Sequence, residues 1–588
     1  MKKLLSGNEA IARGAYEAGC EVATAYPGTP STEILQALAQ YPEIKSEWSI
    51  NEKVALEVAS GASYAGARAL AAMKHVGLNV AADPLFTLSY TGIQGGLVVV
   101  TADDPNLYSS QNEQDNRHFA RSAKLPMLEP SDSDEARRFA ALAFQLSEQY
   151  DCPVLLRSTT RISHGESLVE LAERKPGPIP KKAVRDPAKY VMLPGYARPR
   201  HPLVEARMKK LKACAESFPE NKIEKGEKKF GIITSGAAYQ YAREAFPDAS
   251  FLKLGMVWPL PEKLIHQFAQ MVDKIYVVEE LDPFLEDNLR AMGIKVIGKE
   301  FFPVVGELSP ELVKKGISGP EPVPEIEFDN NIPDRPPNLC AGCPHRGVFY
   351  ALKKLRAFVC GDIGCYTLAA QAPLKSLHTC LCMGAGVGQS FGMEKALGKS
   401  EKVVAVIGDS TFFHSGITPL IDIVYNQGQS TIIVLDNLTT AMTGRQGHPG
   451  SGFNIYGQPS PRISLEKLGE GIGIRTVTID PYDLEQVERV LKQEMEDEKP
   501  SLVIARAPCV LIPEFRKTKK PPMQVSEEKC TGCKICLQLA CPAISWVEKP
   551  DPAKKRKGFA RIDKLSCTGC EICAKVCRDA AIFREDKN

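Results

Sequence analysis

The stretch that decides the fold is residues 403–437, which read VVAVIGDSTFFHSGITPLIDIVYNQGQSTIIVLDN. Two apolar runs rich in β-branched residues, 403–407 and 431–435, enclose a segment in which apolar residues recur at helical spacing. This pattern predicts a strand, a helix and a second strand, joined as a right-handed crossover between neighbouring parallel strands. The stretch therefore predicts an α/β fold.

Polar residues follow each of these two strands. Gly408, Asp409 and Ser410 end the first, and Asn437 comes directly after the second. Ligands bind at the carboxyl ends of strands in open α/β sheets, so we expect Asp409 and Asn437 to lie close together there. Carboxylate and amide oxygens suit Mg²⁺, and Gly408 would let backbone N–H groups approach a phosphate. The alternative is an ordinary strand-to-helix turn with Asp409 as the helix cap.

Length and composition bound the class of protein. At 588 residues the chain predicts roughly four domains. A hydrophobic fraction of 44% and a net charge of +2 are typical of a globular protein, with no electrostatic case for nucleic acid or a membrane surface as partner. No stretch approaches the ~20 apolar residues of a membrane span, and the first residues lack the apolar segment of a signal peptide. We expect a cytoplasmic protein.

The alternation of strands and helices predicts several doubly wound parallel-sheet domains and a small C-terminal α+β domain. Pro-rich and charged stretches predict the boundaries between them. The expected parts are an α/β domain at 1–170, a connecting segment at 171–226, a second α/β domain at 227–314, a Pro-rich linker at 315–337, a third α/β domain at 338–512, and a cysteine-rich domain at 521–588.

The eighteen cysteines indicate metal rather than disulfides, because a long intracellular chain needs no disulfides to fold. Two runs of three cysteines at Cys-x-x-Cys spacing are each followed by a fourth, as in two-cluster ferredoxins, in which the fourth cysteine binds the other cluster. This predicts one 4Fe–4S cluster on Cys530, Cys533, Cys536 and Cys577, and a second on Cys541, Cys567, Cys570 and Cys573. Zinc is the alternative, but paired Cys-x-x-Cys hooks would leave cysteines over.

The basic residues 554–557 lie between the two runs. We predict a solvated hairpin loop there. The alternative is a docking patch for an acidic electron carrier, whose association would depend on salt.

The chain resembles the 2-oxoacid ferredoxin oxidoreductase superfamily over essentially its full length. Residues 26–31, Tyr-Pro-Gly-Thr-Pro-Ser, are similar to its Tyr-Pro-Ile-Thr-Pro-Ser loop, and Gly408-Asp409-Ser410 resembles the Gly-Asp-Gly of the thiamine diphosphate motif. Residues 103–117 look specific to the arylpyruvate branch, the family of indolepyruvate ferredoxin oxidoreductase alpha subunits. The resemblance implies a thiamine diphosphate fold in which the first domain holds the pyrimidine and the third holds the diphosphate. The second α/β domain would resemble the C-terminal domain of transketolase.

The resemblance also implies roles for single residues. Glu52 precedes a helix of small residues, as the catalytic glutamate of the superfamily does, and would hydrogen-bond the aminopyrimidine. Taken alone, Glu52 also fits an acidic first-turn residue at a helix dipole. Thr29 would contact the substrate. The cofactor would be bound by Gly384, Gly408, Asp409, Ser410, Asn437 and Thr439, with Mg²⁺ held by the side chains of Asp409 and Asn437 and the carbonyl of Thr439.

A third 4Fe–4S cluster is a further hypothesis. Relatives with a cluster near thiamine use a Cys-x-x-Cys, a later Gly-Cys and one late cysteine. Cys340, Cys343, Cys365 and Cys509 match in that order. The alternative is buried thiols together with a glycine-rich phosphate loop, and the nearby Cys360 makes the choice of ligands ambiguous. We predict that Cys380 and Cys382 lie in the core.

The activity implied by the resemblance is the oxidative decarboxylation of arylpyruvates such as indolepyruvate. The products would be aryl-acetyl coenzyme A and CO₂, with electrons passing through the clusters to ferredoxin. The coenzyme A site would lie partly in a separate beta subunit, and the assembly would be a dimer of heterodimers. The alternatives are another 2-oxoacid ferredoxin oxidoreductase, a non-redox thiamine decarboxylase with a ferredoxin tail, and a subunit that only transfers electrons.

Overall fold

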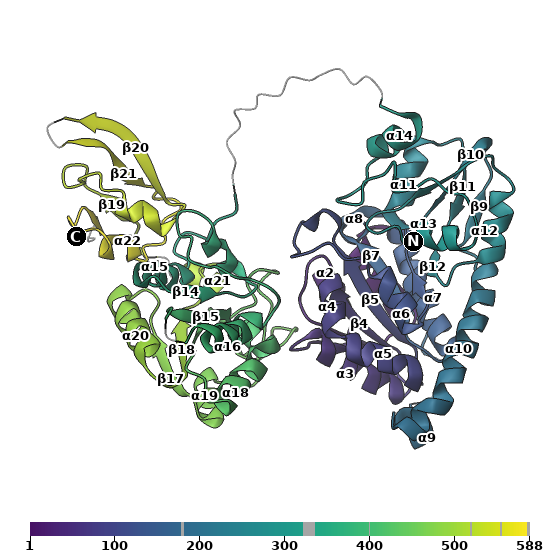
Figure 1. Ribbon diagram of the computed structural model, residues 1–588, viewed down its shortest axis with the longest axis horizontal. Coiled ribbons are helices and arrows are strands. Elements are labelled where there is room, and N and C mark those ends of the chain that lie inside the picture. The colour runs from purple at the N-terminus through teal and green to yellow at the C-terminus, as the bar shows by residue number, and fades with distance from the viewer. Residues whose placement is uncertain (178–180, 321–335, 399, 518–519, 553–554, 585–588) are drawn as a thin grey trace. The chain divides into compact units, whose positions relative to one another are not determined.

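The computed structural model describes residues 1–177, 181–320, 336–398, 400–517, 520–552 and 555–584. The chain divides into two compact units, Met1–Glu327 and Phe328–Asn588, which are described separately (Figure 1). Within the described ranges, no helix combines the length and hydrophobicity needed to cross a membrane.

The first unit contains a seven-stranded sheet in the order β12-β6-β7-β5-β4-β2-β3. All neighbouring strands are parallel except β12, which pairs antiparallel with β6. The central strands are apolar and buried, as expected for a parallel sheet covered on both faces. The strands are β2 (Val22–Ala25), β3 (Lys45–Trp48), β4 (Ala69–Lys74), β5 (Leu97–Asp103), β6 (Met127–Leu128), β7 (Val154–Thr159) and β12 (Met256–Trp258).

Helices connect these strands. Ser6 and Asn51 cap α1 and α3 through side-chain oxygens that accept from the backbone N–H groups of Glu9 and Val54. The helices are α1 (Gly7–Glu17), α2 (Thr32–Leu38), α3 (Glu52–Tyr64), α4 (His75–Val80), α5 (Ala82–Thr91), α6 (Arg117–Ala123), α7 (Ser133–Tyr150) and α8 (Thr160–His164). A two-stranded antiparallel sheet joins β1 (Lys2–Ser6) to β8 (Glu166–Glu170).

A second, four-stranded sheet of this unit has the order β13-β10-β11-β9. One hydrophobic cluster contains residues of both sheets, such as Leu155 and Leu252, which explains why β12 leaves the second α/β region to pair with the first sheet. The strands are β9 (Lys222–Glu224), β10 (Glu227–Thr234), β11 (Ala249–Lys253) and β13 (Ile275–Val278), and the helices are α11 (Gly236–Ala245), α12 (Glu262–Ala269), α13 (Phe284–Ala291) and α14 (Pro310–Ser318).

The boundary segments contain more regular structure than a simple connection. The predicted connecting segment 171–226 includes α9 (Pro187–Tyr190) and the long helix α10 (Pro194–Glu216). The predicted Pro-rich linker 315–337 begins inside α14, and its residues 321–335 lie outside the described residues.

The second unit is built on a parallel five-stranded sheet, in the order β14-β15-β16-β18-β17. The predicted crossover is present: β15 (Val403–Gly408) and β16 (Thr431–Asp436) are parallel neighbours, joined through α17 (Asp409–Thr411), a π-helical turn and α18 (Ile417–Tyr425). The predicted α/β class is confirmed. The other elements are β14 (Phe358–Cys360), β17 (Arg475–Ile479), β18 (Ser501–Arg506), α15 (His345–Leu355), α16 (Ala385–Leu397), α19 (Leu465–Ile472), α20 (Leu484–Glu496) and α21 (Pro513–Lys517).

The cysteine-rich end of the second unit is a small α+β arrangement (Figure 1). Short strands β19 (Met523–Val525) and β22 (Ile582–Arg584) pair antiparallel, β20 (Ile544–Asp551) forms a hairpin with β21 (Arg556–Ile562), and α22 spans Ile572–Lys575. The prediction of a solvated loop is wrong for Arg556, which is 7% exposed and donates hydrogen bonds to the carbonyls of Glu527 and Cys530. Lys554 lies outside the described residues.

Candidate thiamine diphosphate and cluster sites

Asp409 directly follows β15, and it lies beside the start of the loop that follows the neighbouring strand β16. Oδ2 of Asp409 accepts from the backbone N–H of Asn437 at 3.1 Å and of Leu438 at 2.8 Å. Leu438 has a φ of 64°, which turns the chain so that these two N–H groups point at the carboxylate. Asp409 and Asn437 therefore lie together, at the place where we expected a metal and diphosphate site.

The side chains around Asp409 are polar and buried. Nε2 of His448 lies 3.1 Å from Oδ2 of Asp409, and the backbone N–H of Ser410 donates to Oδ1 at 2.8 Å. Burial acts to raise the pKa of Asp409, but His448 and these N–H groups outweigh it and hold the pKa below its ordinary value. Asp409 is thus a carboxylate at neutral pH, as a metal ligand must be.

Asn437 and Thr439 share a short network. Oδ1 of Asn437 accepts from the N–H of Thr439 at 3.1 Å, while Nδ2 lies 3.2 Å from Nε2 of His345. Burial lowers the pKa of His345 to about 4, so its ring is neutral at pH 7 and Nε2 can accept this bond. The amide of Asn437 is therefore oriented by its neighbours.

Close packing explains why glycine occupies the two predicted positions 408 and 384. At Gly408 an added Cβ would lie 2.9 Å from Cε1 of the buried Tyr366 ring. Gly384 has a φ of 89°, and its Cβ would meet Cβ of Ser415 at 2.6 Å. Ser410 replaces the second glycine of the thiamine motif without strain, because it sits in the right-handed helix α17.

Asp362 is a residue that the sequence reasoning missed. Its two carboxylate oxygens accept from the backbone N–H groups of Gly384 and Gly386, each at 3.0 Å, and so fix the start of α16. Burial raises the pKa of Asp362 to about 6. The signal available in the sequence was its place in Gly-Asp-Ile-Gly, directly before Cys365. His345 and His448 carried no comparable signal.

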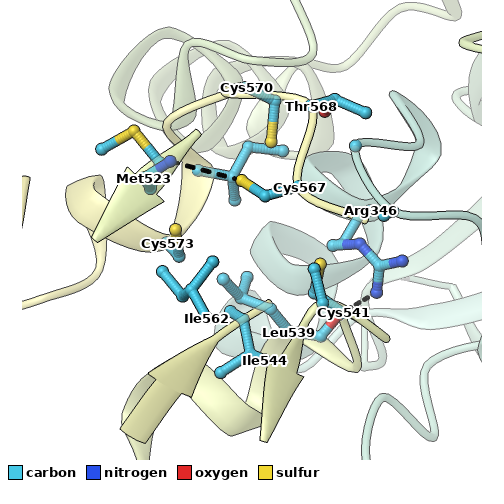
Figure 2. Close-up of a pocket in the computed structure, with 14 residues that line it drawn as sticks. Arg346, Met523, Leu539, Cys541, Ile544, Ile562, Cys567, Thr568, Cys570 and Cys573 are labelled. Carbon is cyan, nitrogen blue, oxygen red and sulfur yellow. Dashed lines mark hydrogen bonds between the residues drawn. The ribbon is translucent and has the colours of Figure 1, made fainter. Parts of the chain in front are cut away.

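The cysteines of the two ferredoxin-type runs gather in two pockets. Cys541, Cys567, Cys570 and Cys573 line the first (Figure 2), and Cys530, Cys533, Cys536 and Cys577 line the second. These are the two sets expected from the spacing, each with its fourth cysteine from the other run. Backbone N–H groups already point at sulfur: those of Met523 and Gly569 lie 3.4 Å from Sγ of Cys567. The donor sets fit 4Fe–4S clusters.

Cys340, Cys343, Cys365 and Cys509 also lie near one another. Burial raises the pKa of Cys343 to about 12 and of Cys365 to about 11, and charge on neighbouring cysteines of this set adds to both. Burial likewise raises the pKa of Cys509, and charge on Cys340 adds to it. The thiols of this set are therefore coupled electrostatically to one another, as a third cluster would require. Cys360 is elsewhere, with its Sγ 3.5 Å from Sδ of Met393.

The prediction that Cys380 and Cys382 are core residues is wrong, since both are exposed. Leu381 between them is also 62% exposed. The reason is that this stretch is the irregular entry to α16 rather than part of a strand or helix that could bury them.

In the first unit, Glu52 and the 26–31 loop lie at the carboxyl ends of neighbouring parallel strands. Glu52 is the first residue of α3, is only 4% exposed, and lies against Gly77, where a Cβ would be 2.6 Å from Oε1. The carbonyl of Thr29 accepts from Oγ of Ser109 at 3.2 Å.

Lys74, which ends β4, is a second residue that the sequence reasoning missed. Its Nζ donates to the carbonyl of Ser109 at 2.9 Å, and its stem packs on Gly28, where an added Cβ would lie 3.1 Å from Cγ and Cδ. Burial lowers the pKa of Lys74 to about 8, although the negative charges of Asp104 and Glu52 act to raise it. The signal available was the replacement of isoleucine by Gly28, which leaves room for a long side chain.

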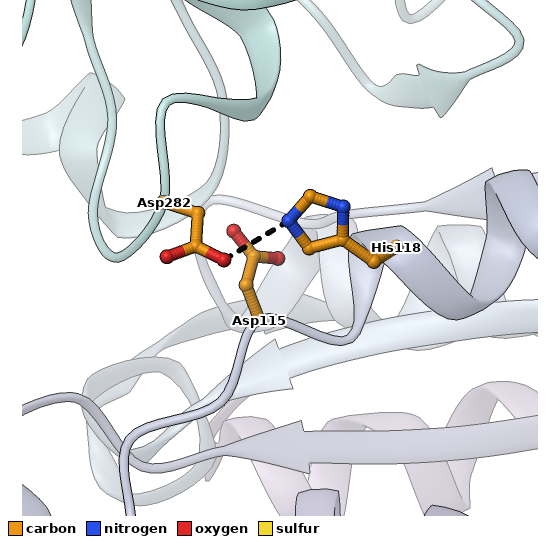
Figure 3. A group of neighbouring side chains, drawn as sticks. All are labelled: Asp115, His118 and Asp282. Atoms are coloured by element: carbon orange, nitrogen blue, oxygen red, sulfur yellow. Dashed lines mark hydrogen bonds and ion pairs between the residues drawn. The ribbon is translucent and has the colours of Figure 1, made fainter.

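Asp115, His118 and Asp282 form a further polar group (Figure 3). Both carboxylate oxygens of Asp115 accept from the buried guanidinium of Arg117, which also pairs with Glu279 at 2.7 Å. Nε2 of His118 lies 3.0 Å from Oδ2 of Asp282, and both side chains are about half exposed. The group is therefore an ion-pair network that joins the two sheets of the first unit.

Comparison with known proteins assigns both units. Residues 13–220 match the family model described as pyruvate flavodoxin/ferredoxin oxidoreductase, thiamine diphosphate-binding, and residues 362–505 match the C-terminal thiamine pyrophosphate-binding domain of thiamine pyrophosphate enzymes. The fold and the site thus define the class as that of thiamine diphosphate-dependent 2-oxoacid oxidoreductases.

Curated relatives narrow the class. The chain is 43% identical to indolepyruvate oxidoreductase subunit IorA of Archaeoglobus fulgidus, with 92% of each chain covered. It is 42% identical to the protein of that name from Pyrococcus abyssi, over 94% of this chain and 93% of the relative. The chain belongs to the indolepyruvate oxidoreductase subunit IorA family, which confirms the resemblance seen in the sequence.

Proposed function

We propose that this chain is the alpha subunit of an enzyme that oxidatively decarboxylates arylpyruvates, indolepyruvate among them, to aryl-acetyl coenzyme A and CO₂. Two electrons per turnover pass to ferredoxin. The observation that carries the proposal is the combination, in one chain, of the Asp409–Asn437 site with three gathered sets of four cysteines. A decarboxylase without redox chemistry has no use for the cysteines, and an electron carrier has no use for Asp409.

At the diphosphate site, the carboxylate of Asp409, the amide oxygen of Asn437 and the carbonyl of Thr439 would hold Mg²⁺. Thiamine diphosphate, when bound, supplies the electron sink that lets a 2-oxo acid lose CO₂. Gly384, Gly408 and Ser410 would border the diphosphate. The N–H groups of Gly384 and Ser410 donate to Asp362 and Asp409, so these residues would shape the site through their backbone position. His448 and the N–H groups of Asn437 and Leu438 keep Asp409 ionised and oriented, which supports this assignment.

In the first unit, Glu52 would hydrogen-bond the aminopyrimidine. Its burial supports this role, because an acidic residue that only complements a helix dipole is normally solvated. Thr29 would contact the substrate. Beside it, Lys74 would bind the carboxylate of the 2-oxo acid, since among the described residues its ammonium makes one hydrogen bond and has no acidic group within ion-pair distance.

Three 4Fe–4S clusters would accept the electrons singly, on the three cysteine sets described above. The proximity of Cys340, Cys343, Cys365 and Cys509 supports the third. The eighteen cysteines, with none in a disulfide, support a reducing cytoplasmic setting. The relatives are named as subunits, and we assign the coenzyme A site partly to a separate beta subunit, in a dimer of heterodimers.

The test is a substrate panel with the chain and its beta subunit purified together. We expect indolepyruvate, phenylpyruvate and hydroxyphenylpyruvate to reduce ferredoxin in a coenzyme A-dependent reaction, and pyruvate and 2-oxoglutarate to react far more slowly. Preference for a non-aromatic 2-oxo acid would show that arylpyruvates are not the substrate class. Release of aldehyde without any electron acceptor would indicate a non-redox decarboxylase instead.

A further inference from the structure

Arg346 is a fully buried cation placed between two cysteine sets. It is the second residue of α15, and its side chain is among the largest with under 2% exposure. Nη2 donates to the carbonyls of Leu339 and Cys340, each at 2.9 Å, and Nη1 donates to the carbonyl of Leu539. Nη2 therefore holds the loop of Cys340 and Cys343, and Nη1 holds the segment just before Cys541.

The same guanidinium borders the pocket of Cys541, Cys567, Cys570 and Cys573 (Figure 2). The rest of that pocket is mostly apolar, with Met523, Ile544 and Ile562 among its walls. Nε of Arg346 is buried and has no hydrogen-bond partner in the part of the chain that the structure describes. No carboxylate among those residues lies within ion-pair distance of it either. A buried charge with an unused N–H group requires an anion nearby.

The cysteine set itself supplies that anion. Four thiolates around a 4Fe–4S core carry a net negative charge, which increases by one on reduction. Arg346 borders the pocket of this set and donates to the carbonyl of Cys340 in the neighbouring set, so its charge lies close to both. The two loops also touch directly, since Gly342 of one packs on Thr568 of the other.

We propose that Arg346 is the counter-charge of the cluster on Cys541, Cys567, Cys570 and Cys573, and that its Nε–H donates a hydrogen bond to a sulfur of that cluster. Arg346 is then a positioning residue that raises the reduction potential of this cluster, because a nearby cation stabilises the more negative reduced form. Arg346 also holds the loop of Cys340 in contact with the loop that carries Cys567. This inference rests on the cluster assignment in the proposed function.

The first experiment needs no variant. The holoenzyme is prepared with ¹⁵N-arginine, the clusters are reduced, and pulsed electron paramagnetic resonance measures ¹⁵N hyperfine coupling to each. We expect one arginine nitrogen coupled to the cluster whose signal is lost on Cys541→Ser substitution. Absence of arginine ¹⁵N coupling to that cluster would overturn the hydrogen bond.

The second experiment is a redox titration of the holoenzyme followed by the same signals. We expect Arg346→Met to move the potential of this cluster to more negative values with iron content retained, and Arg346→Lys, which keeps the charge, to move it less. Lys354→Met is the matched control, because it removes an exposed charge from the same helix. Equal shifts for Arg346→Met and Lys354→Met would overturn the counter-charge role. A wild-type enzyme inactive on every arylpyruvate but with these potential shifts would contradict the proposed function alone.

Discussion

Gly342 and Thr568 are in direct contact: a Cβ added to Gly342 would lie 2.0 Å from Oγ1 of Thr568. Gly342 is the residue before Cys343, and Thr568 is the residue after Cys567. Only a residue without a side chain allows the loop of one cysteine set to pack this closely on the loop of another. In the proposed enzyme, this contact would keep the clusters of the two sets close together.

We expect Gly342→Ala to destabilise this packing. Gly342 has a φ of 72°, so alanine costs about 1–2 kcal/mol in backbone strain, and the clash adds roughly 1–3 kcal/mol. Gly457→Ala is the control, with a φ of 71° and open space around its Cβ. Denaturant titration followed by cluster absorbance compares the two. Equal loss of stability in both variants would mean that the contact with Thr568 carries no energy.

Iron content tests the third cysteine set. We expect about twelve irons per chain, from three clusters of four, and about eight in Cys340→Ser or Cys365→Ser. Cys360→Ser is the control and should keep about twelve, because Cys360 lies away from the set. About eight irons in the wild-type chain would exclude the third cluster.

Asp409→Ala should weaken binding of magnesium and thiamine diphosphate roughly 100-fold or more, since a ligand and the centre of its hydrogen-bond network are lost together. Calorimetric titration of the cofactor measures this, and cluster absorbance should not change. Asp422→Ala, at an exposed position on α18, should bind as the wild type does. Unchanged cofactor affinity in Asp409→Ala would remove this residue from the site.

Lys74→Met should raise the KM for arylpyruvates about 10–100-fold, the usual worth of a charge-assisted hydrogen bond. Inhibition by 3-phenylpropanoate should weaken similarly, whereas inhibition by the neutral 3-phenylpropanamide should not. The pKa of Lys74 is lowered to about 8 by burial, so the lysine loses its charge as pH rises through 8, and wild-type affinity for the acids should fall there. Lys74→Arg should abolish that fall. Equal weakening of both inhibitors would indicate a structural role only.

Glu280 predicts a pH dependence of stability in the first unit. Burial raises its pKa from 4.5 to about 7, while the N–H of Leu308 donates to Oε1 at 3.0 Å. Between these values the folded state binds more protons than the unfolded one. The stabilisation is therefore complete below about pH 4.5 and is lost as pH rises to about 7, a change of about 3 kcal/mol.

Glu280→Gln mimics the neutral acid and should remove this dependence, so the variant should be more stable than the wild type at pH 7.5 but not at pH 4.5. Urea unfolding of the first unit at both pH values measures the difference. Glu244→Gln, at an exposed position of α11, serves as the control. A variant that follows the wild type at both pH values would show that Glu280 is ionised in the folded state.

The sequence by itself determined the α/β class, the crossover at 403–437, the family and the pairing of the eight C-terminal cysteines into two sets. These features depend on the local periodicity of apolar residues and on the spacing of motifs along the chain, and both are visible in the sequence alone. The tertiary structure decided what long-range packing alone can place. The tertiary structure places β12 in the first sheet, leaves Cys380 and Cys382 exposed to solvent, and buries Arg556. It also set His448 on Asp409 and brought Arg346 from α15 to a pocket formed some 200 residues later. The physical reason is that a buried charge is positioned by partners distant in sequence, and no local pattern records where those partners will be.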